Sequence, residues 1–569
     1  MKWKTSLLVL AVMAVALAIL FKIATRVPQP PVHQVFIQGE VLTMDSNNQI
    51  AQAVSVRGER IEAVGSNADI MQLVTDETVI TDLRGRTLMP GFIDAHGHFP
   101  GSALTRIHAD LNSPPIGKLN TMAEVMAALS AQADKTPDGD WVVGMGYDDT
   151  LLAENRHPTR AELDQVSSEH PVVAVHVSGH MVVVNSAALA VVGIDASTAD
   201  PEGGVIGRRS NSQEPNGLLQ ENAQWEVAKY AYELGAMDSI RLIKMASTEY
   251  AAIGVTTAQS GGVDEGLIKG VSVFIKLGVI PIRVVLFPAE TELGESLLTG
   301  DFQGEDYASD RLTIGPVKLI ADGSIQGYTG YLTEPYYMPY HGEASYLGYP
   351  SISRVLLFEK VKALHQAGHQ MAIHANGDAS IDDALDAFAA AQKLHPVEDP
   401  RLILIHAQMA REDQIVRMKE LGVTPSFFSA HTWYWGDRHR DIFMGPERAE
   451  NMSPAGWAQD NGLRYSTHLD TPVTPMQPLQ SVWSTAFRIT HGGQLLGPQQ
   501  RVSVMQALRS VTIDAAWQVF EEDNRGSLEP GKYADMIILS GSPLKDPMAM
   551  RELKIKTTLV GGATIYQSR

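Results

Sequence analysis

The segment GFIDAHGH, residues 91–98, follows the apolar run TLMP and ends in two histidines separated by one glycine. The stretch 88–95 predicts a buried strand, because short apolar runs bounded by turn residues are typical of parallel sheets. Side chains two residues apart on a strand point to the same side, so His96 and His98 can bind one metal ion. Gly97 allows close backbone approach. Taken without the preceding strand, His96 and His98 could equally be two polar residues in a loop.

Seven further strands are predicted downstream, and helical patterns separate most of them. The eight strands are 88–95, 254–260, 282–287, 316–321, 370–374, 401–406, 423–428 and 463–469. The helical patterns cover 265–277, 353–367, 380–394 and 412–421. Alternating strands and helices predict a parallel sheet. Eight such units predict a closed (β/α)8 TIM-type barrel, with chemistry at the C-terminal strand ends.

Both chain ends carry short strands separated by turn residues. Residues 33–87 and 527–569 are predicted to meet in one small β-sandwich, and residues 88–526 to form the barrel domain. Residues 99–240 follow the first barrel strand and contain their own apolar runs, at 141–146 and 172–177. They predict an α/β insertion over the barrel mouth, because a structureless loop of this length is uncommon.

The N-terminus predicts export. Residues 1–27 combine basic residues with an apolar run at 7–21, and a Pro-rich linker follows at 28–32. This pattern is typical of a signal peptide or an uncleaved signal anchor, although the run is short for a membrane span. We therefore expect a periplasmic or extracytoplasmic protein tethered to the membrane by this segment alone, and cleavage stays open. The absence of cysteine is consistent with an oxidising compartment.

Composition narrows the function further. The chain has 44% hydrophobic and 19% charged residues, which are globular values. Its net charge of -20 argues against nucleic-acid binding, which requires clustered Lys and Arg. A solvated acidic surface explains this charge, with a preference for cationic substrates as the alternative. Without cysteine, disulfides, thiolate zinc sites and cysteine nucleophiles are excluded. The oligomeric state stays open, with a homodimer as one candidate.

Residues suited to metal chemistry fall at or near the ends of five predicted barrel strands. In chain order they are His96 and His98, Lys318, His374, His406 and Asp470. A lone lysine on a strand is usually solvated, and a lone histidine at a strand end is often a polar rim residue. Six such residues on barrel strands favour a shared metal site instead.

Several motifs resemble one known family. The segment 91–98 resembles the signature of the amidohydrolase superfamily. The segments VKLIADGS (317–324), IHANGD (373–378) and LIHAQ (404–408) resemble its YtcJ-like branch, amidohydrolase family 3, which includes N-substituted formamide deformylases. The segments 179–181, 185–189 and 214–218 resemble it too. GSLEPGKYAD (526–535) is typical of the returning sandwich, so the resemblance covers about residues 35–569.

The resemblance implies roles for the six residues. His96 and His98 would bind one metal, His374 and His406 a second, Lys318 would bridge them after carboxylation by CO₂, and Asp470 would contact the metal and act as general base. A buried lysine is readily neutralised, and a neutral amine can react with CO₂. Zinc is the expected cofactor, as one or two ions, although iron, manganese or nickel would also fit these ligands.

The implied reaction is hydrolysis of a non-peptide carbon–nitrogen bond in a small-molecule amide by metal-activated water. A cyclic amidase, a deaminase or an esterase could use the same barrel, because function lies in the loops. An exported ligand-binding protein without catalysis is the alternative from another class. His180, Tyr328 and Trp433 are candidates for substrate binding, with ordinary packing an equal alternative for the aromatic run 427–436.

Some histidines depart from the pattern. The family often has Ser-Asp after its last strand, where this chain has His468 two residues before Asp470; His468 is either an extra polar contact or a strand residue facing the helices. His365 and His369 have the spacing of a zinc helix but lack the required Glu, and Gly368 predicts the end of that helix. His439 lies in the charged stretch 437–441, which predicts a solvated loop.

Overall fold

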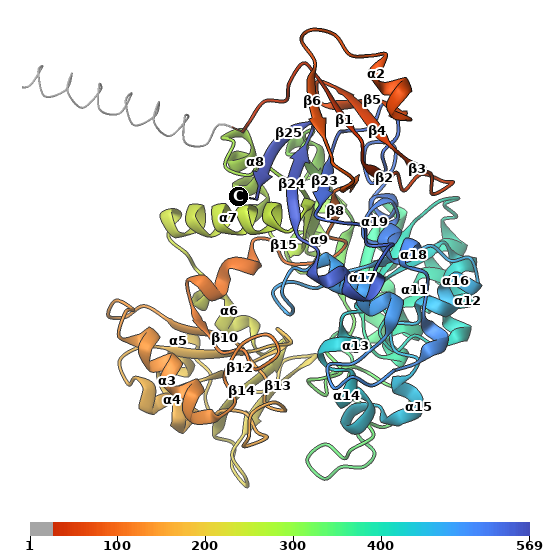
Figure 1. Cartoon of the computed structure of the whole chain (residues 1–569). Helices are drawn as coiled ribbons and strands as arrows, with labels where there is room; N and C mark the ends of the chain where they lie inside the picture. Colours follow the sequence, from red (N-terminus) through yellow and green to blue (C-terminus); the bar gives the residue numbers. More distant parts are fainter. Residues whose placement is uncertain (1–26, 569) are drawn as a thin grey trace, which may run out of the picture.

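A computed structural model describes residues 27–568 and shows a mixed α/β fold (Figure 1). All eight predicted strand positions carry a strand, and β17, which the sequence did not predict, adds a ninth; they form two parallel sheets with the orders β17-β16-β15-β8 and β18-β19-β20-β21-β22. Their bounds are β8 (Phe92–Ile93), β15 (Val255–Val263), β16 (Arg283–Pro288), β17 (Leu312–Ile314), β18 (Val317–Ile320), β19 (Met371–Ala375), β20 (Leu402–His406), β21 (Val423–Phe427) and β22 (Ser466–Thr467). Every strand pair in these two sheets is parallel, as predicted.

The outer edges of the two sheets approach each other just beyond β8 and β22. The backbone N–H of Asp470 donates to the carbonyl of His96 over 3.2 Å, and that of His98 donates to Thr471 over 2.8 Å. An isolated parallel bridge joins Ala289, directly after β16, to Lys318 on β18, the edge strand of the other sheet. These contacts bring the strand ends together, whereas a closed barrel stays a prediction.

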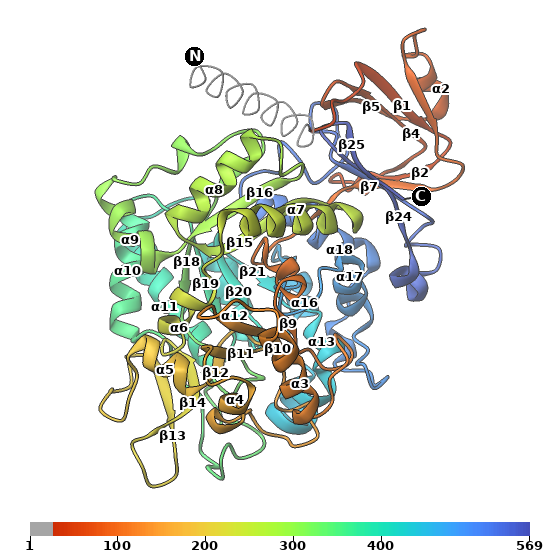
Figure 2. The same ribbon diagram turned by 90° about the vertical axis from the view of Figure 1, so that its left-hand side faces the viewer.

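The four predicted helices are confirmed, and they pack outside the strands (Figure 2). They are α8 (Glu265–Lys276), α10 (Arg354–Gln366), α11 (Asp378–Leu394) and α12 (Glu412–Leu421). The helix α12 ends at Gly422, whose φ of +67° suits glycine at a helix C-terminus. The sequence patterns missed α7 (Ala236–Ala252) and α9 (Glu290–Thr299). Apolar residues from strands and helices form the largest hydrophobic cluster of the described residues.

The two chain ends share one six-stranded sheet, in which the N-terminal strands lie beside the C-terminal ones (Figure 1). Its order is β25 (Ala563–Gln567), β24 (Ile555–Val560), β23 (Met536–Leu539), β7 (Thr87–Pro90), β2 (Glu40–Leu42) and β3 (Ile50–Ala51). A second sheet has the order β5 (Arg60–Gly65), β4 (Ala53–Arg57), β1 (His33–Ile37) and β6 (Val79–Asp82). A cluster that includes Phe36, Leu88 and Met536 packs between them. Both chain ends thus share a core, while the sandwich itself stays a prediction.

A separate six-stranded sheet follows β8, within the predicted insertion. Its order is β13 (Gly204–Arg208), β14 (Pro215–Glu221), β12 (Met181–Val184), β11 (Val172–His176), β10 (Val142–Tyr147) and β9 (Ala109–Asp110). The domain boundaries stay predictions. Within residues 27–568, no helix has both the length and the hydropathy to cross a membrane. The predicted signal segment lies in residues 1–26, outside the described part of the chain.

Candidate metal centre

The C-terminal ends of the parallel strands bring all six predicted metal-site residues to one cavity. His96, His98, Lys318, His374, His406 and Asp470 all line it. Five of them are buried, whereas the side chain of His98 is 46% exposed. The residues are spread along the chain from position 96 to position 470, so only the fold brings them together. Their individual roles stay predictions.

One half of the site consists of His96, His98 and Asp470. Asp470 Oδ1 lies 3.2 Å from His98 Nε2 and 3.4 Å from His96 Nε2. The candidate ligand atoms of all three residues lie within 4.8 Å of one another. Asp470 Oδ1 is buried without a well-oriented hydrogen bond among the described residues. A carboxylate and two imidazoles converging in this way fit a divalent cation.

The other half consists of His374 and His406. His374 Nδ1 lies 3.0 Å from His406 Nε2, and His406 Nε2 lies 3.9 Å from Asp470 Oδ2. Burial holds the pKa of each imidazole well below its usual value, so both are neutral at physiological pH. A neutral imidazole is the form that binds a metal.

Lys318 lies between the two halves. Its Nζ is 3.4 Å from His96 Nε2, and its side chain is buried. Burial lowers the pKa of Lys318 to about 7, although Asp470 opposes this shift. A large fraction of the amine is therefore neutral at pH 7, which is the reactive form towards CO₂.

Backbone conformation gives these side chains their positions. A Cβ atom on Gly97 would lie 2.5 Å from Asp94 Oδ2, which confirms the close approach predicted at this glycine. A Cβ on Gly261 would lie 2.6 Å from the ring of His96. His406 and Asp470 themselves adopt positive φ angles of 71° and 53°. Left-handed non-glycine residues are uncommon, and they cluster at functional sites where the fold enforces them.

The cavity has a volume of about 560 Å³ and its wall is mainly apolar. Apolar contributions come from the insertion, α7 and the loop after β8, and include Phe99, Leu104, Met145, Val175, Leu242 and Ile243. Apolar walls with a few convergent polar groups are typical of small-molecule sites.

The three predicted substrate contacts lie in different surroundings. His180 lines the cavity, and its Nδ1 donates to Glu221 Oε2 over 2.8 Å. Burial lowers the pKa of His180, but the charge and the hydrogen bond of Glu221, together with the charges of Asp470 and Asp322, outweigh burial and the net shift is upward. Tyr328 packs against other aromatic rings, including Phe443 at 5.1 Å, and Trp433 against His491 at 4.9 Å. Neither is among the described residues that line the cavity.

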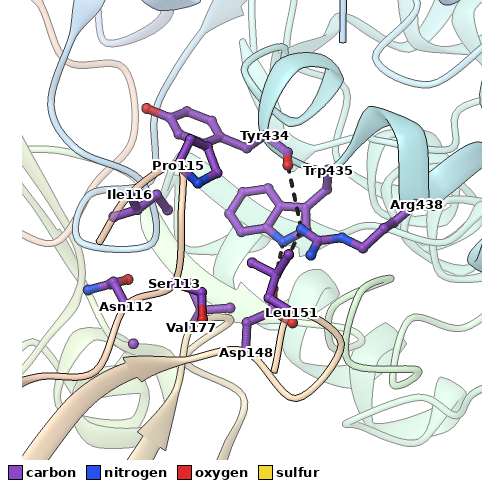
Figure 3. Close-up of a pocket in the computed structure, with 11 residues that line it drawn as sticks. Asn112, Ser113, Pro115, Ile116, Asp148, Leu151, Val177, Tyr434, Trp435 and Arg438 are labelled. Atoms are coloured by element: carbon purple, nitrogen blue, oxygen red, sulfur yellow. Dashed lines mark hydrogen bonds and ion pairs between the residues drawn. The ribbon is translucent and has the colours of Figure 1, made fainter. Parts of the chain in front are cut away.

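The aromatic run after β21 contacts the insertion through Trp435 (Figure 3). The indole Nε1 of Trp435 donates to Asp148 Oδ2 over 3.0 Å, and Arg438 lies 3.6 Å from the same oxygen. Asp148 follows β10 directly, and Trp435 is buried. This part of the run therefore joins the loop after β21 to the end of β10.

The prediction of a solvated loop at His439 was wrong. His439 is fully buried, and its Nε2 lies 3.1 Å from both Gln408 Nε2 and His431 Nδ1. Its charged neighbours Arg440 and Asp441 face outwards in a π-helical turn, where they pair with each other. Gln408 and His431 line a small polar recess beside the metal site. By contrast, the predicted helix end near Gly368 is confirmed, since α10 stops at Gln366.

Sequence reasoning missed one buried group next to the site, Asp322, and left two interpretations open for a second, His468. Asp322, two residues after β18, accepts backbone hydrogen bonds from Tyr331, Asn376 and Gly377 at 2.8–2.9 Å. His468 is buried with its Nε2 3.0 Å from His406 Nδ1, so the first of its two interpretations, an extra polar contact, is confirmed.

Comparisons with known proteins agree on one family. The model of the Amidohydrolase family matches residues 79–566. The N-substituted formamide deformylase of Arthrobacter pascens is 29% identical over 548 residues, which cover 93% of this chain and 98% of that protein. YtcJ of Bacillus subtilis (strain 168), named as an amidohydrolase, is 26% identical over 93% of this chain and 98% of its own. An uncharacterized metal-dependent hydrolase from Pyrococcus furiosus superposes with a TM-score of 0.70 at 25% identity, covering 90% of this chain and all of that one.

Proposed function

This chain belongs to the amidohydrolase family, as its motifs predicted, and on that premise we propose that it hydrolyses a non-peptide carbon–nitrogen bond in a small-molecule amide. The observation that carries the proposal is the convergence of six metal-site residues on one cavity. The donors fit divalent metal, zinc being the best candidate: His96 and His98 would hold one ion, and His374 and His406 another. A bound ion would polarise the amide carbonyl and lower the pKa of water at the site.

Lys318 is proposed to bridge the two halves as a carbamate. Its neutral amine would attack CO₂ and release one proton, which leaves a carbamate whose single negative charge is shared by two oxygens. The lysine lies against His96, and its pKa of about 7 makes this reaction accessible at neutral pH.

Asp470 is proposed as the general base. Its carboxylate lies within 3.2–3.9 Å of three of the histidines, at the point where the two halves meet. Water attacking the amide carbon would lose its proton to Asp470, which would then donate it to the departing nitrogen. This shuttle yields a carboxylic acid and an amine. His180, held by Glu221, faces the same cavity and is proposed to hydrogen-bond the substrate.

The cavity favours substrates with a sizeable apolar substituent. Its apolar wall would take an alkyl or aryl group, while the amide lies at the polar side beside Asp470. The relative from Arthrobacter pascens is named for N-substituted formamides. N-formyl and other N-acyl amines with apolar substituents are therefore the first substrates to assay.

A panel of N-acyl amines tests this proposal. Metal-loaded protein should release free amine, and removal of metal with a chelator should abolish that release. Leu242, buried on the cavity wall, offers a steric test. Leu242→Phe should lower kcat/KM more for amines with bulky substituents than for the methyl compound. The ratio of the two kcat/KM values within one variant does not depend on the fraction of that variant that is folded. The proposal fails if no member of the panel is hydrolysed, and the predicted substrate placement fails if the ratio is unchanged.

A further inference from the structure

A buried chain of hydrogen bonds runs from the metal centre to α19 (Ile513–Gln518), on the outer side of the strands. His406 Nδ1 lies 3.0 Å from His468 Nε2, and His468 Nδ1 lies 2.9 Å from Ser426 Oγ. Ser426 Oγ lies 2.8 Å from Ser466 Oγ, which lies 2.5 Å from Gln518 Oε1. None of the five side chains is more than 2% exposed. Hydrogen bonds in such a chain have a direction, because each proton can be donated only once.

The direction is set at the outer end by Gln518. Its Nε2 lies 3.0 Å from the carbonyl oxygen of Pro425 and 2.9 Å from Thr424 Oγ1. A backbone carbonyl can only accept, so the NH₂ group must face Pro425 and Oε1 must face Ser466. Thr424 donates its own proton to the carbonyl of Arg464 over 2.7 Å and is therefore free to accept. The hydroxyl of Ser466 consequently donates to Gln518.

Each later donor follows from the one before. Because the proton of Ser466 is used on Gln518, Ser426 must donate to Ser466, and Ser426 then accepts from His468 Nδ1–H. Both ring nitrogens of His468 contact uncharged partners, and a neutral imidazole has one donor and one acceptor nitrogen. His468 Nε2 is therefore the acceptor, and the proton in that contact belongs to His406 Nδ1. The lone pair of His406 is then on Nε2, which faces His374 and Asp470.

We propose that His468 is a positioning residue that holds the proton of His406 on Nδ1 and so assigns Nε2 as the metal-binding atom. This inference rests on the proposed metal-dependent function. A free imidazole can carry its proton on either nitrogen, and the wrong tautomer would present an N–H to the ion. Residues that orient a metal-binding histidine typically contribute about 10–100-fold to metal affinity.

Metal binding is the readout that separates positioning from packing. In the full-length protein, zinc affinity is measured by competition with a chromophoric chelator, and the thermal midpoint is measured without metal. His468→Leu should weaken the more loosely held zinc equivalent about 10–100-fold. His468→Gln should recover part of that affinity, because its amide oxygen can accept from His406. Ser426→Ala, which keeps both rings, should lose less affinity than His468→Leu.

His365→Leu is the matched control. His365 lies in α10, is 4% exposed, and donates from Nε2 to the backbone carbonyl of His395 over 2.8 Å. It is not among the described residues that line the cavity. It should lower the thermal midpoint of the metal-free protein and leave zinc affinity unchanged. The inference is overturned if His468→Leu binds zinc like wild type, or if its affinity loss only matches that of His365→Leu. A wild-type protein that binds no zinc would instead refute the proposed function itself.

Discussion

Asp322 offers a graded test of how the site loops are held. Its carboxylate is fully buried and joins the loop after β18 to the loop after β19. One oxygen accepts from Asn376, and the other accepts from Tyr331 and Gly377. The same carboxylate lies 3.7 Å from His374 Nε2. Substitution should therefore affect both the stability of the protein and the position of this histidine.

The size of the effect follows from the number of donors left without a partner. A buried donor that loses its acceptor costs about 1–3 kcal/mol. Asp322→Asn keeps one oxygen, which can still accept the hydrogen bonds of Tyr331 and Gly377. Its NH₂ group then faces the backbone N–H of Asn376, which loses its acceptor. One donor is lost, so unfolding should require about 1–3 kcal/mol less. Asp322→Ala loses the acceptor for all three donors and should cost at least about 3 kcal/mol.

Urea denaturation followed by circular dichroism measures both changes. Asp460→Asn, at an exposed position, is the matched control and should stay within about 0.5 kcal/mol of wild type. The reasoning is refuted if Asp322→Asn is as mild as the control, or if Asp322→Ala is no worse than Asp322→Asn.

Three further predictions concern the site itself. Lys318→Ala should lose bound metal and activity, with partial rescue by added short carboxylates; full activity without rescue would exclude the bridging role. Asp470→Asn should retain most of its metal by elemental analysis but lose turnover, and undiminished turnover would remove Asp470 from the mechanism. Burial, with a smaller contribution from Arg438, lowers the pKa of His439 to about 3 from 6.5. Below pH 6.5 the unfolded chain binds a proton at His439 that the folded protein does not bind, so the protein loses stability as the pH decreases. Between pH 7 and 5.5 this residue should lower the free energy of unfolding of the wild type by about 1.3 kcal/mol. In urea denaturation, His439→Gln should therefore lose about 1.3 kcal/mol less stability than the wild type over the same pH range. Equal losses would contradict burial of a neutral ring.

The strands and the site residues were predictable because their signals are local. Parallel strands buried on both faces appear as short apolar runs, as in 401–406, and β20 matches that run within one residue. Each metal-site residue falls at or near the C-terminal end of such a run. That position alone brings it to the shared edge of the sheet, so the cluster followed from the order of the strands.

The misses have physical reasons as well. Four charged neighbours made His439 look exposed, yet the π-helical turn His439–Phe443 directs this one ring inwards. The run 427–436 does not reveal which ring faces which way: Trp433 is not among the described residues that line the cavity, while Trp435 contacts the insertion. Asp322 bonds backbone groups up to 55 residues away, and no local pattern reports such a contact.

Elemental analysis of the purified full-length protein tests the metal centre most directly. One or two equivalents of zinc or another transition metal per chain are expected, and His96→Ala should lose metal because it removes a buried imidazole from the cluster. A protein that is metal-free as purified, and that takes up no metal after incubation with zinc and bicarbonate, would contradict the proposed hydrolase.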